Sequence, residues 1–453
     1  MTRIFRLTAL ILSVLTLSMA LCSCGITEIF KQELDLPTVT PRGIPETVSK
    51  DYINLNQNES NASSYYTPVH PRHSYAMLSE GQQALYDLLY DSVREVYPDT
   101  DDGEELYKTR QVIVEDYVLS VADIRVAAKA LYDDNPDIFW LSSTIYQLTD
   151  KSAGYTAVQM RSIYAPEEIQ RMQEEITSVM DAFYEEIPSE LSEYGREKYV
   201  HDYIINNCEY DSDAAATQTS TDRIEEAYSV YGTLVLHKAV CEGYARTMQL
   251  LLCGVGIDCV GITGVGCDTD GNEELHMWDA VSLDDSWYFV DPTWDDQDYD
   301  YRRYQYFNLD EETMGKDHQP SRLLSELSEA EINGDDTYSA VAMNIFVPEC
   351  NSTYYQYYIY ECPHLTDYEG EEITDGIYRA AYYQEEYISI YIDPDALDYD
   401  DSLSLLFSES PQYFFDYIRQ VNGWLSDYEI DDSNLIYYNN RERNVVTVML
   451  NYY

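Results

Sequence analysis

A helical pattern followed by three alternating segments, between residues 231 and 294, constrains the fold more than any other feature. In "YGTLVLHKAVCEGYARTMQLLLCGVG" the helical period places Cys241 and Tyr244 on one apolar face, and Gly254 or Gly256 suits the end of a helix. "IDCVGITG", "LHMWDAVSL" and "SWYFVDPTW" then alternate apolar and polar residues, as half-buried strands do. This order predicts an α+β fold in which a helix headed by Cys241 packs on an antiparallel sheet.

Two interpretations of Cys241 are open at this point. The apolar helix face alone favours packing, because a free cysteine is a small and easily buried side chain. A thiol in the first helical turn also meets the positive end of the helix dipole, which favours the thiolate. The N–H groups of that turn are suited to stabilising an oxyanion. A nucleophilic role further requires a nearby imidazole.

The second alternating segment supplies that imidazole. His276 is one of seven histidines and shares a strand face with Trp278. A two-residue turn at Asp284 and Asp285 places Asp291 opposite Trp278, and therefore diagonally across from His276 on the same face. A slip of one residue would separate the two side chains. The hairpin thus offers a base and an orienting carboxylate to the Cys241 thiolate.

Three ordered motifs carry a family resemblance. "YGTLVLHKAVCEGYA", "LHMWDAVSLDDSWYFVDPTWDD" and "YFNLDEETMGKDH" resemble the bacterial branch of the transglutaminase-like superfamily, which has a papain-like fold; the resemblance covers roughly residues 135–318. It implies that Cys241 is the nucleophile, His276 the general base and acid, and Asp291 the residue that orients the imidazole. The family often has Asn where this chain has Asp279, and strand alternation turns Asp279 away from His276.

The resemblance leaves the reaction open, because the superfamily contains glutamine–amine transferases, thiol peptidases, amidases and inactive members. Its active members share thiolate attack on a carbonyl. We expect acyl transfer at an amide bond, with hydrolysis by a peptidase or amidase ahead of amine crosslinking. The expected substrate is a peptide or cell-wall material, and Tyr244, Trp278 and Trp294 are the candidate substrate-binding residues. The alternatives are a protein-glutamine crosslinking enzyme and a non-catalytic peptide- or carbohydrate-binding lipoprotein.

The N-terminus predicts export and lipidation. The apolar run "LTALILSVLTLSMAL" follows Arg3 and Arg6, as in a secretory signal. "LCSC" resembles a bacterial lipobox, in which Cys24 is the lipid-modified residue; an ordinary signal peptide cut nearby is the alternative. We expect a mature protein that starts at Cys24 and is anchored by acyl chains outside the cytoplasmic membrane.

Charge and cysteine content exclude several partners. The chain has 27 Lys and Arg against 83 Asp and Glu, which repels nucleic acid and anionic lipid headgroups. We therefore expect membrane contact through the lipid anchor alone. Of nine cysteines, seven remain without Cys22 and Cys24, so at least one thiol is unpaired. No cysteine pair has zinc-knuckle spacing, and we expect neither a metal nor a cofactor.

Composition and pattern predict five segments: a signal peptide at 1–23, a flexible linker at 24–75, an N-terminal helix-rich α/β region at 76–160, a transglutaminase-like core at 161–320 and a Tyr-rich α+β domain at 335–453. In the last domain we predict strands at "YYQYYIY", "YISIYI" and "NVVTVML", and one helix at "PQYFFDYIRQVNGWL". Its tyrosines either form a ligand-binding face or reflect the strand preference of Tyr, and the second interpretation is favoured.

Overall fold

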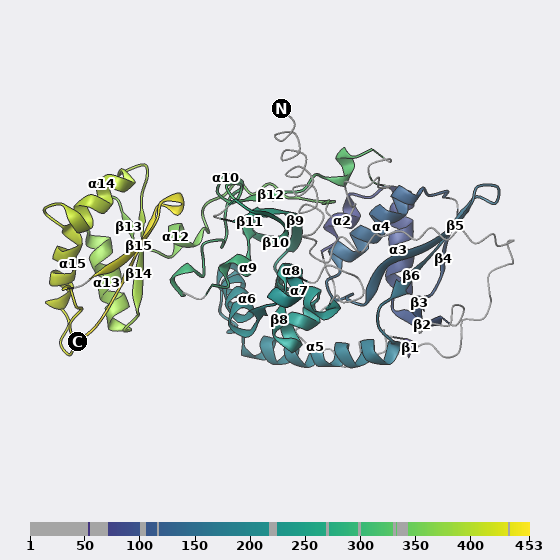
Figure 1. Ribbon diagram of the computed structural model, residues 1–453, viewed down its shortest axis with the longest axis horizontal. Helices are drawn as coiled ribbons and strands as arrows, with labels where there is room; N and C mark the ends of the chain where they lie inside the picture. Colours follow the sequence, from purple (N-terminus) through teal and green to yellow (C-terminus); the bar gives the residue numbers. More distant parts are fainter. Residues whose placement is uncertain are drawn as a thin grey trace, which may run out of the picture. The chain divides into compact units, whose positions relative to one another are not determined.

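The computed structural model describes residues 53–54, 71–99, 106–115, 117–216, 224–268, 271–297, 300–328, 332, 343–433 and 435–453. The predicted signal peptide, Cys24 and most of the predicted linker lie outside these residues. The chain divides into two compact units: Met1–Thr293 with Met314–Glu349, and Trp294–Thr313 with Cys350–Tyr453 (Figure 1). Residues 294–313, placed in the core by the sequence analysis, thus lie in the second unit. The five predicted functional segments stay a prediction.

The first unit begins with helices packed on an antiparallel sheet. The helices are α2 (His73–Ala76), α3 (Glu80–Ser92) and α4 (Val121–Asp134); the strands are β1 (Ile53–Asn54), β2 (Glu95–Asp99), β3 (Leu106–Thr109), β4 (Val112–Glu115), β5 (Leu141–Asp150) and β6 (Tyr155–Ser162). The strand order is β1-β2-β3-β6-β4, with β5 also paired to β6. Capping boxes at Ser79 and Ser120 start α3 and α4 by satisfying N–H groups of the first turn. The predicted linker therefore ends before residue 75, since α2 begins at His73.

Further along the first unit, a second sheet carries the Cys241 region. Its strands are β9 (Cys259–Cys267), β10 (Glu273–Leu283), β11 (Ser286–Val290) and β12 (His318–Pro320), in the antiparallel order β11-β10-β9-β12. The helices of this region are α5 (Pro166–Glu186), α6 (Glu193–Asn207), α7 (Ser212–Ala216) and α8 (Cys241–Gly254), and a short parallel pair joins β7 (Glu209–Tyr210) to β8 (Lys238–Ala239). Figure 1 shows α8 beside β9 and β10, which it contacts.

Helix α8 is buried on nearly its whole circumference. Cys241 through Leu252 are all buried, including the charged Glu242 and Arg246. A buried aliphatic side chain such as Leu251 contributes about 1.5–3 kcal/mol. Gly243 permits the close packing of the first turn, because a Cβ there would lie 2.7 Å from the carbonyl oxygen of Ala227. The N-terminus of α8 is therefore fixed inside the protein.

The β10–β11 hairpin has the predicted register. Asp284 and Asp285 form its two-residue turn with φ of 47° and 62°, and Asp279 pairs with Val290 at the far end of the ladder. Positive φ at both turn positions is the geometry that matches the twist of paired strands, and Asp tolerates it. The register prediction is confirmed, and it brings Asp291 to the end of β11 beside the His276 strand.

The second unit has one sheet and its own core. The strands β13 (His364–Leu365), β14 (Tyr387–Ile392), β15 (Ile436–Asn440) and β16 (Val445–Met449) have the order β13-β14-β16-β15. The helices include α12 (Tyr357–Tyr360), α13 (Glu371–Tyr382), α14 (Tyr399–Leu403) and α15 (Tyr413–Asn422). Ile377, Phe414 and Ile418 pack with Ile390 and Val446 in this core.

One predicted strand of the second unit was wrong. The segment "YYQYYIY" ends in helix α12, which buries Tyr358 and leaves Tyr354 and Tyr360 exposed. The strand preference of tyrosine reflects packing on a pleated surface, and here the rings pack on other tyrosines, such as Tyr357 on Tyr304. The predictions for β14, β16 and α15 are confirmed.

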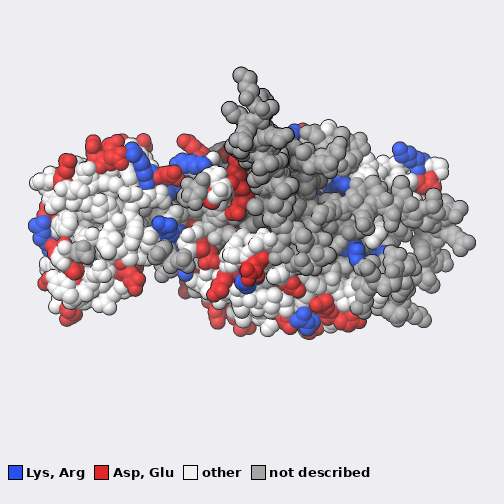
Figure 2. All heavy atoms as spheres, viewed as in Figure 1, with Lys and Arg blue, Asp and Glu red and all other residues white. Residues whose placement is uncertain are grey.

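The predicted fold class, a mixture of helices and antiparallel sheets, is confirmed. Among the described residues, no helix has the length and apolar character to cross a bilayer. Figure 2 shows Asp and Glu side chains spread over the described surface, with Lys and Arg in smaller groups, as the charge balance predicts.

Candidate active site

The predicted nucleophile, Cys241, is the first residue of α8 and is 1% exposed. The N-cap residue, Val240, has an extended backbone and offers no side-chain hydrogen bond to the first turn. The positive end of the helix dipole therefore acts on the thiol without a capping carboxylate or hydroxyl at the N-cap. This end of α8 favours a negative charge on sulfur.

His276 lies on β10 between the thiol and a carboxylate. Its Nε2 is 2.6 Å from Oδ2 of Asp291, and its ring is hydrogen-bonded to the side chain of Cys241. Burial alone would lower the pKa of His276, but the charge and hydrogen bond of Asp291, with the hydrogen bond of Cys241, raise it to about 10. The site thus favours an imidazolium beside the sulfur.

Asp291 is buried and accepts three hydrogen bonds. Its Oδ1 accepts from the N–H of Thr293 at 2.9 Å, and its Oδ2 accepts from His276 and, at 3.0 Å, from Nε2 of His318. Burial opposes ionisation, but the two imidazoles hold the pKa of Asp291 well below its usual range. Asp291 is therefore a carboxylate whose orientation is set from two sides.

His318 is the site residue that sequence reasoning missed. It opens the short strand β12, is 1% exposed, and places Nδ1 2.7 Å from Oδ1 of Asp317. In the sequence it is only the last residue of the third family motif, because a three-residue strand is too short to carry a periodic signal. Its pairing with Gly266 on β9 brings it to the sheet that carries His276.

A glycine on the central strand lets the two imidazoles meet across it. His276 pairs with Gly264 on β9, and the ring of Trp278 lies where a side chain at Gly264 would be, so a Cβ there would overlap it. The ring centroids of His276 and His318 are 5.4 Å apart, and Trp278 meets the His318 ring edge-on at 5.0 Å. Trp278 thus forms one wall around both imidazoles.

His276, Asp291 and His318 each offer one possible metal-ligand atom, and these three atoms lie within 4.8 Å of one another. Two ligands of one tetrahedral ion, each about 2 Å from it, would be about 3.3 Å apart. The 2.6 Å separation between His276 and Asp291 is instead that of a charge-assisted hydrogen bond. The short separation between these two atoms therefore indicates a hydrogen bond and not two ligands of one metal ion.

The three candidate substrate-binding residues lie in different surroundings. Tyr244 and Trp278 are fully buried, and Trp278 also packs on Phe289. Trp294 belongs to the second unit and lies in the short helix α9 (Pro292–Asp295), where its ring meets Tyr306 edge-on at 5.2 Å. A substrate-binding role for these residues stays a prediction.

Asp279, the departure from the family pattern, contacts a second cysteine. Its Oδ1 is 3.6 Å from Sγ of Cys259, and its Oδ2 is buried without a hydrogen-bond partner among the described residues. Burial raises the pKa of Asp279 well above its ordinary value. Burial therefore favours the neutral form of the Asp279 carboxyl beside the site.

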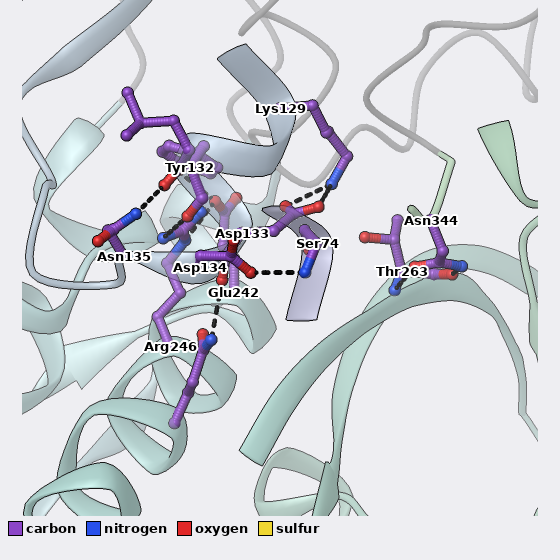
Figure 3. Close-up of polar contacts among 12 residues, drawn as sticks. Ser74, Lys129, Tyr132, Asp133, Asp134, Asn135, Glu242, Arg246, Thr263 and Asn344 are labelled. Carbon is purple, nitrogen blue, oxygen red and sulfur yellow. Dashed lines mark hydrogen bonds and ion pairs between the residues drawn. The ribbon is translucent and has the colours of Figure 1, made fainter. Parts of the chain in front are cut away.

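Helix α4 holds the first turn of α8 through a buried polar cluster (Figure 3). The hydroxyl of Tyr132 donates to Oε1 of Glu242 at 2.6 Å, and Nε of Arg246 donates to the same oxygen at 3.1 Å. The Arg246 guanidinium also lies 3.3 Å from the centroid of the Tyr132 ring. Because Glu242 follows Cys241 directly, these contacts fix the backbone that carries the thiol.

The same end of α4 anchors α2. Asp134 accepts hydrogen bonds from the N–H groups of Ser74 and Tyr75, both at 2.9 Å, as Figure 3 shows for Ser74. Burial raises the pKa of Asp134 to about 6 despite these two bonds. The amide of Gln249 in α8 donates to the carbonyl of Asp133 at 2.8 Å, so α2, α4 and α8 are joined through one segment.

Comparison with known proteins relates part of this chain to a family. Residues 181–292 match the model of the Transglutaminase-like superfamily. A curated mouse protein, Kyphoscoliosis peptidase, is 29% identical over 110 residues, which cover 23% of this chain and 16% of that protein. The chain thus matches less than a fifth of the length of that relative.

Solved structures have a weaker likeness. One solved structure, described as a TGase, is 15% identical to this chain. The match covers 41% of this chain and 51% of the solved chain, with a TM-score of 0.23. A proposed cysteine protease from Cytophaga hutchinsonii is 16% identical, with 33% and 61% covered and a TM-score of 0.21. Scores this low support no argument. The family match stands on the matched sequence, and residues 181–292 of this chain form a transglutaminase-like domain.

Proposed function

We propose that this protein is a thiol enzyme that performs acyl transfer at an amide bond through Cys241, His276 and Asp291. One observation carries the proposal: the His276 imidazole lies between the Cys241 thiol and the Asp291 carboxylate, at the buried N-terminus of α8. This is the arrangement of nucleophile, base and orienting group that acyl transfer requires.

Acylation starts from the thiolate–imidazolium pair. The Cys241 sulfur uses a lone pair to bond to the amide carbonyl carbon, and the π electron pair of the C=O bond moves to the oxygen. The N–H groups at the start of α8 would stabilise the resulting oxyanion. The intermediate collapses to a thioester, and the departing amine takes a proton from His276. Asp291 keeps Nε2 of His276 oriented throughout.

Deacylation needs a second nucleophile. In hydrolysis, neutral His276 accepts a proton from water as the water oxygen attacks the thioester carbon. The acid leaves, and the thiolate returns beside an imidazolium. We favour hydrolysis, as a peptidase or amidase, over transfer to an amine, since an exported enzyme meets water in excess. The name of the mouse relative, a peptidase, supports the same preference.

The proposed location is the outer face of the cytoplasmic membrane or beyond, with Cys24 as the lipid anchor and a peptide or cell-wall substrate. The signal-like N-terminus and the large acidic excess support it, and the same charge argues against nucleic acid as a partner. Detergent-phase partitioning tests the anchor: Cys24→Ser should move the protein to the aqueous phase, and an unchanged distribution would contradict lipidation.

A non-catalytic binding function is the second candidate, because the second unit has exposed aromatic rings. Tyr382 and Tyr383 are 62% and 69% exposed, and Trp424, at 47%, meets Tyr378 edge-on. Such rings can stack on sugars or peptides. This function needs no reactive thiol, so the chemistry of Cys241 separates the two candidates.

Trapping the acyl-enzyme tests the proposed function. Protein incubated with cell-surface extract and quenched in acid should carry a thioester adduct on Cys241, and the mass of the adduct identifies the acyl group. Cys241→Ser should carry no such adduct. Water should then release the acyl group as an acid. Efficient incorporation of a labelled amine would contradict the preference for hydrolysis, and the absence of any Cys241 adduct would contradict the enzyme.

A further inference from the structure

We propose that His318 is a positioning residue, an imidazolium that bridges Asp291 and Asp317 and thereby sets both the orientation of the Asp291 carboxylate and the charge around the Cys241–His276 pair. The proposal rests on the function proposed above for that pair. Neither the triad roles nor the family motif assigns this task to His318. Three arguments support it: the contacts of the ring, its burial and the charges that face it.

The contacts require two N–H groups on the ring. Nε2 lies 3.0 Å from Oδ2 of Asp291, and Nδ1 lies 2.7 Å from Oδ1 of Asp317. A carboxylate oxygen only accepts hydrogen bonds, so each ring nitrogen has to donate. A neutral imidazole carries a single N–H. The two contacts together therefore describe a positively charged His318.

Burial strengthens the attraction between the His318 charge and the two carboxylates, because little water screens it. The His318 side chain is fully buried, that of Asp291 is fully buried, and that of Asp317 is 18% exposed. Burial by itself lowers the pKa of His318, but the hydrogen bonds and charges of Asp291 and Asp317 raise it above its ordinary value. Hydrogen bonds with both partners ionised are among the strongest in proteins.

The geometry assigns two effects to His318. First, Oδ2 of Asp291 accepts from both imidazoles while Oδ1 accepts from Thr293, so the carboxylate cannot rotate without breaking a bond. Second, the titratable groups around the ring are Asp291 and His276 on the hairpin side and Asp317 beside it, and the ring centroid of His276 is only 5.4 Å away. A cation 5.4 Å from the His276 ring lowers the pKa of that imidazole. The same positive charge also favours the thiolate form of Cys241.

His318→Gln separates charge from structure, because the glutamine amide keeps a donor for Asp291 and removes the positive charge. The assay is the rate of Cys241 alkylation by iodoacetamide against pH on the full chain, with the modified peptide identified by mass. We expect the acidic limb of the profile to move upward by up to about one pH unit, because the variant loses a cation 5.4 Å from the His276 ring that is hydrogen-bonded to Cys241. Thermal melting at each pH controls for folding.

The outcomes distinguish this inference from the proposed function. A wild-type Cys241 that reacts below pH 8, with an identical limb in folded His318→Gln, would overturn the role of His318 and leave the enzyme intact. A wild-type Cys241 that is unreactive below pH 8 would overturn the function itself. A drop in melting temperature without a shift of the limb would reduce His318 to a structural residue.

A second measurement applies even if His318→Gln does not fold. In His276→Ala labelled with ¹⁵N-histidine, the His318 ring should remain protonated on both nitrogens at pH 8, because Asp291 and Asp317 still hold it. Ordinary histidines, with a pKa of ~6.5, are neutral at that pH. If every ring in that variant has a single N–H at pH 8, His318 is neutral and the proposal fails.

Discussion

At the scale of single residues, the sequence predicted the contacts of the site where regular structure carries them. Cys241 and His276 lie on strongly periodic segments, and Asp291 follows from a two-residue turn whose register the structure confirms. His318 could not be found in this way, because its strand has only three residues and carries no periodic pattern. Its role depends on tertiary contacts with Asp291 and Asp317, which no local pattern encodes.

Asp279 allows a test of burial and charge at the residue scale. Its folded-state pKa is raised by burial, so the folded protein keeps a proton that the unfolded chain releases above pH ~4. Stability therefore falls as pH rises from there toward the folded pKa. Asp279→Asn lacks this loss. Above pH ~4 and below the folded-state pKa of Asp279, the unfolding free energy of the variant should therefore rise relative to that of the wild type by about 1.4 kcal/mol per pH unit.

Urea unfolding of both proteins at pH 5 and pH 8 measures the effect of Asp279→Asn. The difference in unfolding free energy should grow in favour of the variant at the higher pH. A difference that is the same at both pH values would show that Asp279 is ionised in the folded state, and that its burial beside Cys259 is compensated by contacts other than a bound proton.

At the scale of elements, the sequence predicted helices, strands and turns correctly where tertiary packing agreed with their local conformational preference. Capping boxes at Ser79 and Ser120 are local signals that begin α3 and α4, and the turn at Asp284 and Asp285 joins the two strands of the predicted hairpin. In contrast, α12 replaces a predicted strand, because its tyrosine rings pack on one another and on Tyr304. The polar cluster between α4 and α8 was invisible in sequence, since Tyr132 and Glu242 are far apart in the chain.

That cluster leads to an expectation for Tyr132→Phe. The substitution removes the hydrogen bond to buried Glu242, and bonds to charged groups contribute about 1.5–3 kcal/mol. We expect the unfolding free energy to fall by roughly that amount, while the pH profile of Cys241 alkylation stays unchanged, because Tyr132 contacts the helix and not the thiol.

The matched control is Tyr155→Phe, since Tyr155 is partly exposed and no side-chain hydrogen bond of its hydroxyl is found among the described residues. This control should change the unfolding free energy by less than about 0.5 kcal/mol. Equal effects of the two substitutions would show that the α4–α8 cluster does not stabilise the protein.

At the scale of the whole molecule, the chain combines a transglutaminase-like domain at residues 181–292 with a second compact unit that has its own core. Composition predicted the Tyr-rich C-terminal domain, but not that residues 294–313 lie in the same unit. The acidic excess is a property of the whole chain and bears on partners more than on fold. The proposed chemistry depends on the first unit, which contains Cys241, His276, Asp291 and His318.

The central claim is that His276 keeps Cys241 as a thiolate, and the alkylation rate of Cys241 against pH tests it most directly. In the wild type, we expect reaction well below the ordinary thiol pKa of ~8.5, because the pKa of His276 is raised to about 10 and its imidazolium persists beside the sulfur. In His276→Ala, the onset should move up toward or beyond ~8.5. Identical profiles in the two proteins, or a wild-type Cys241 that reacts only above pH 8, would contradict the account.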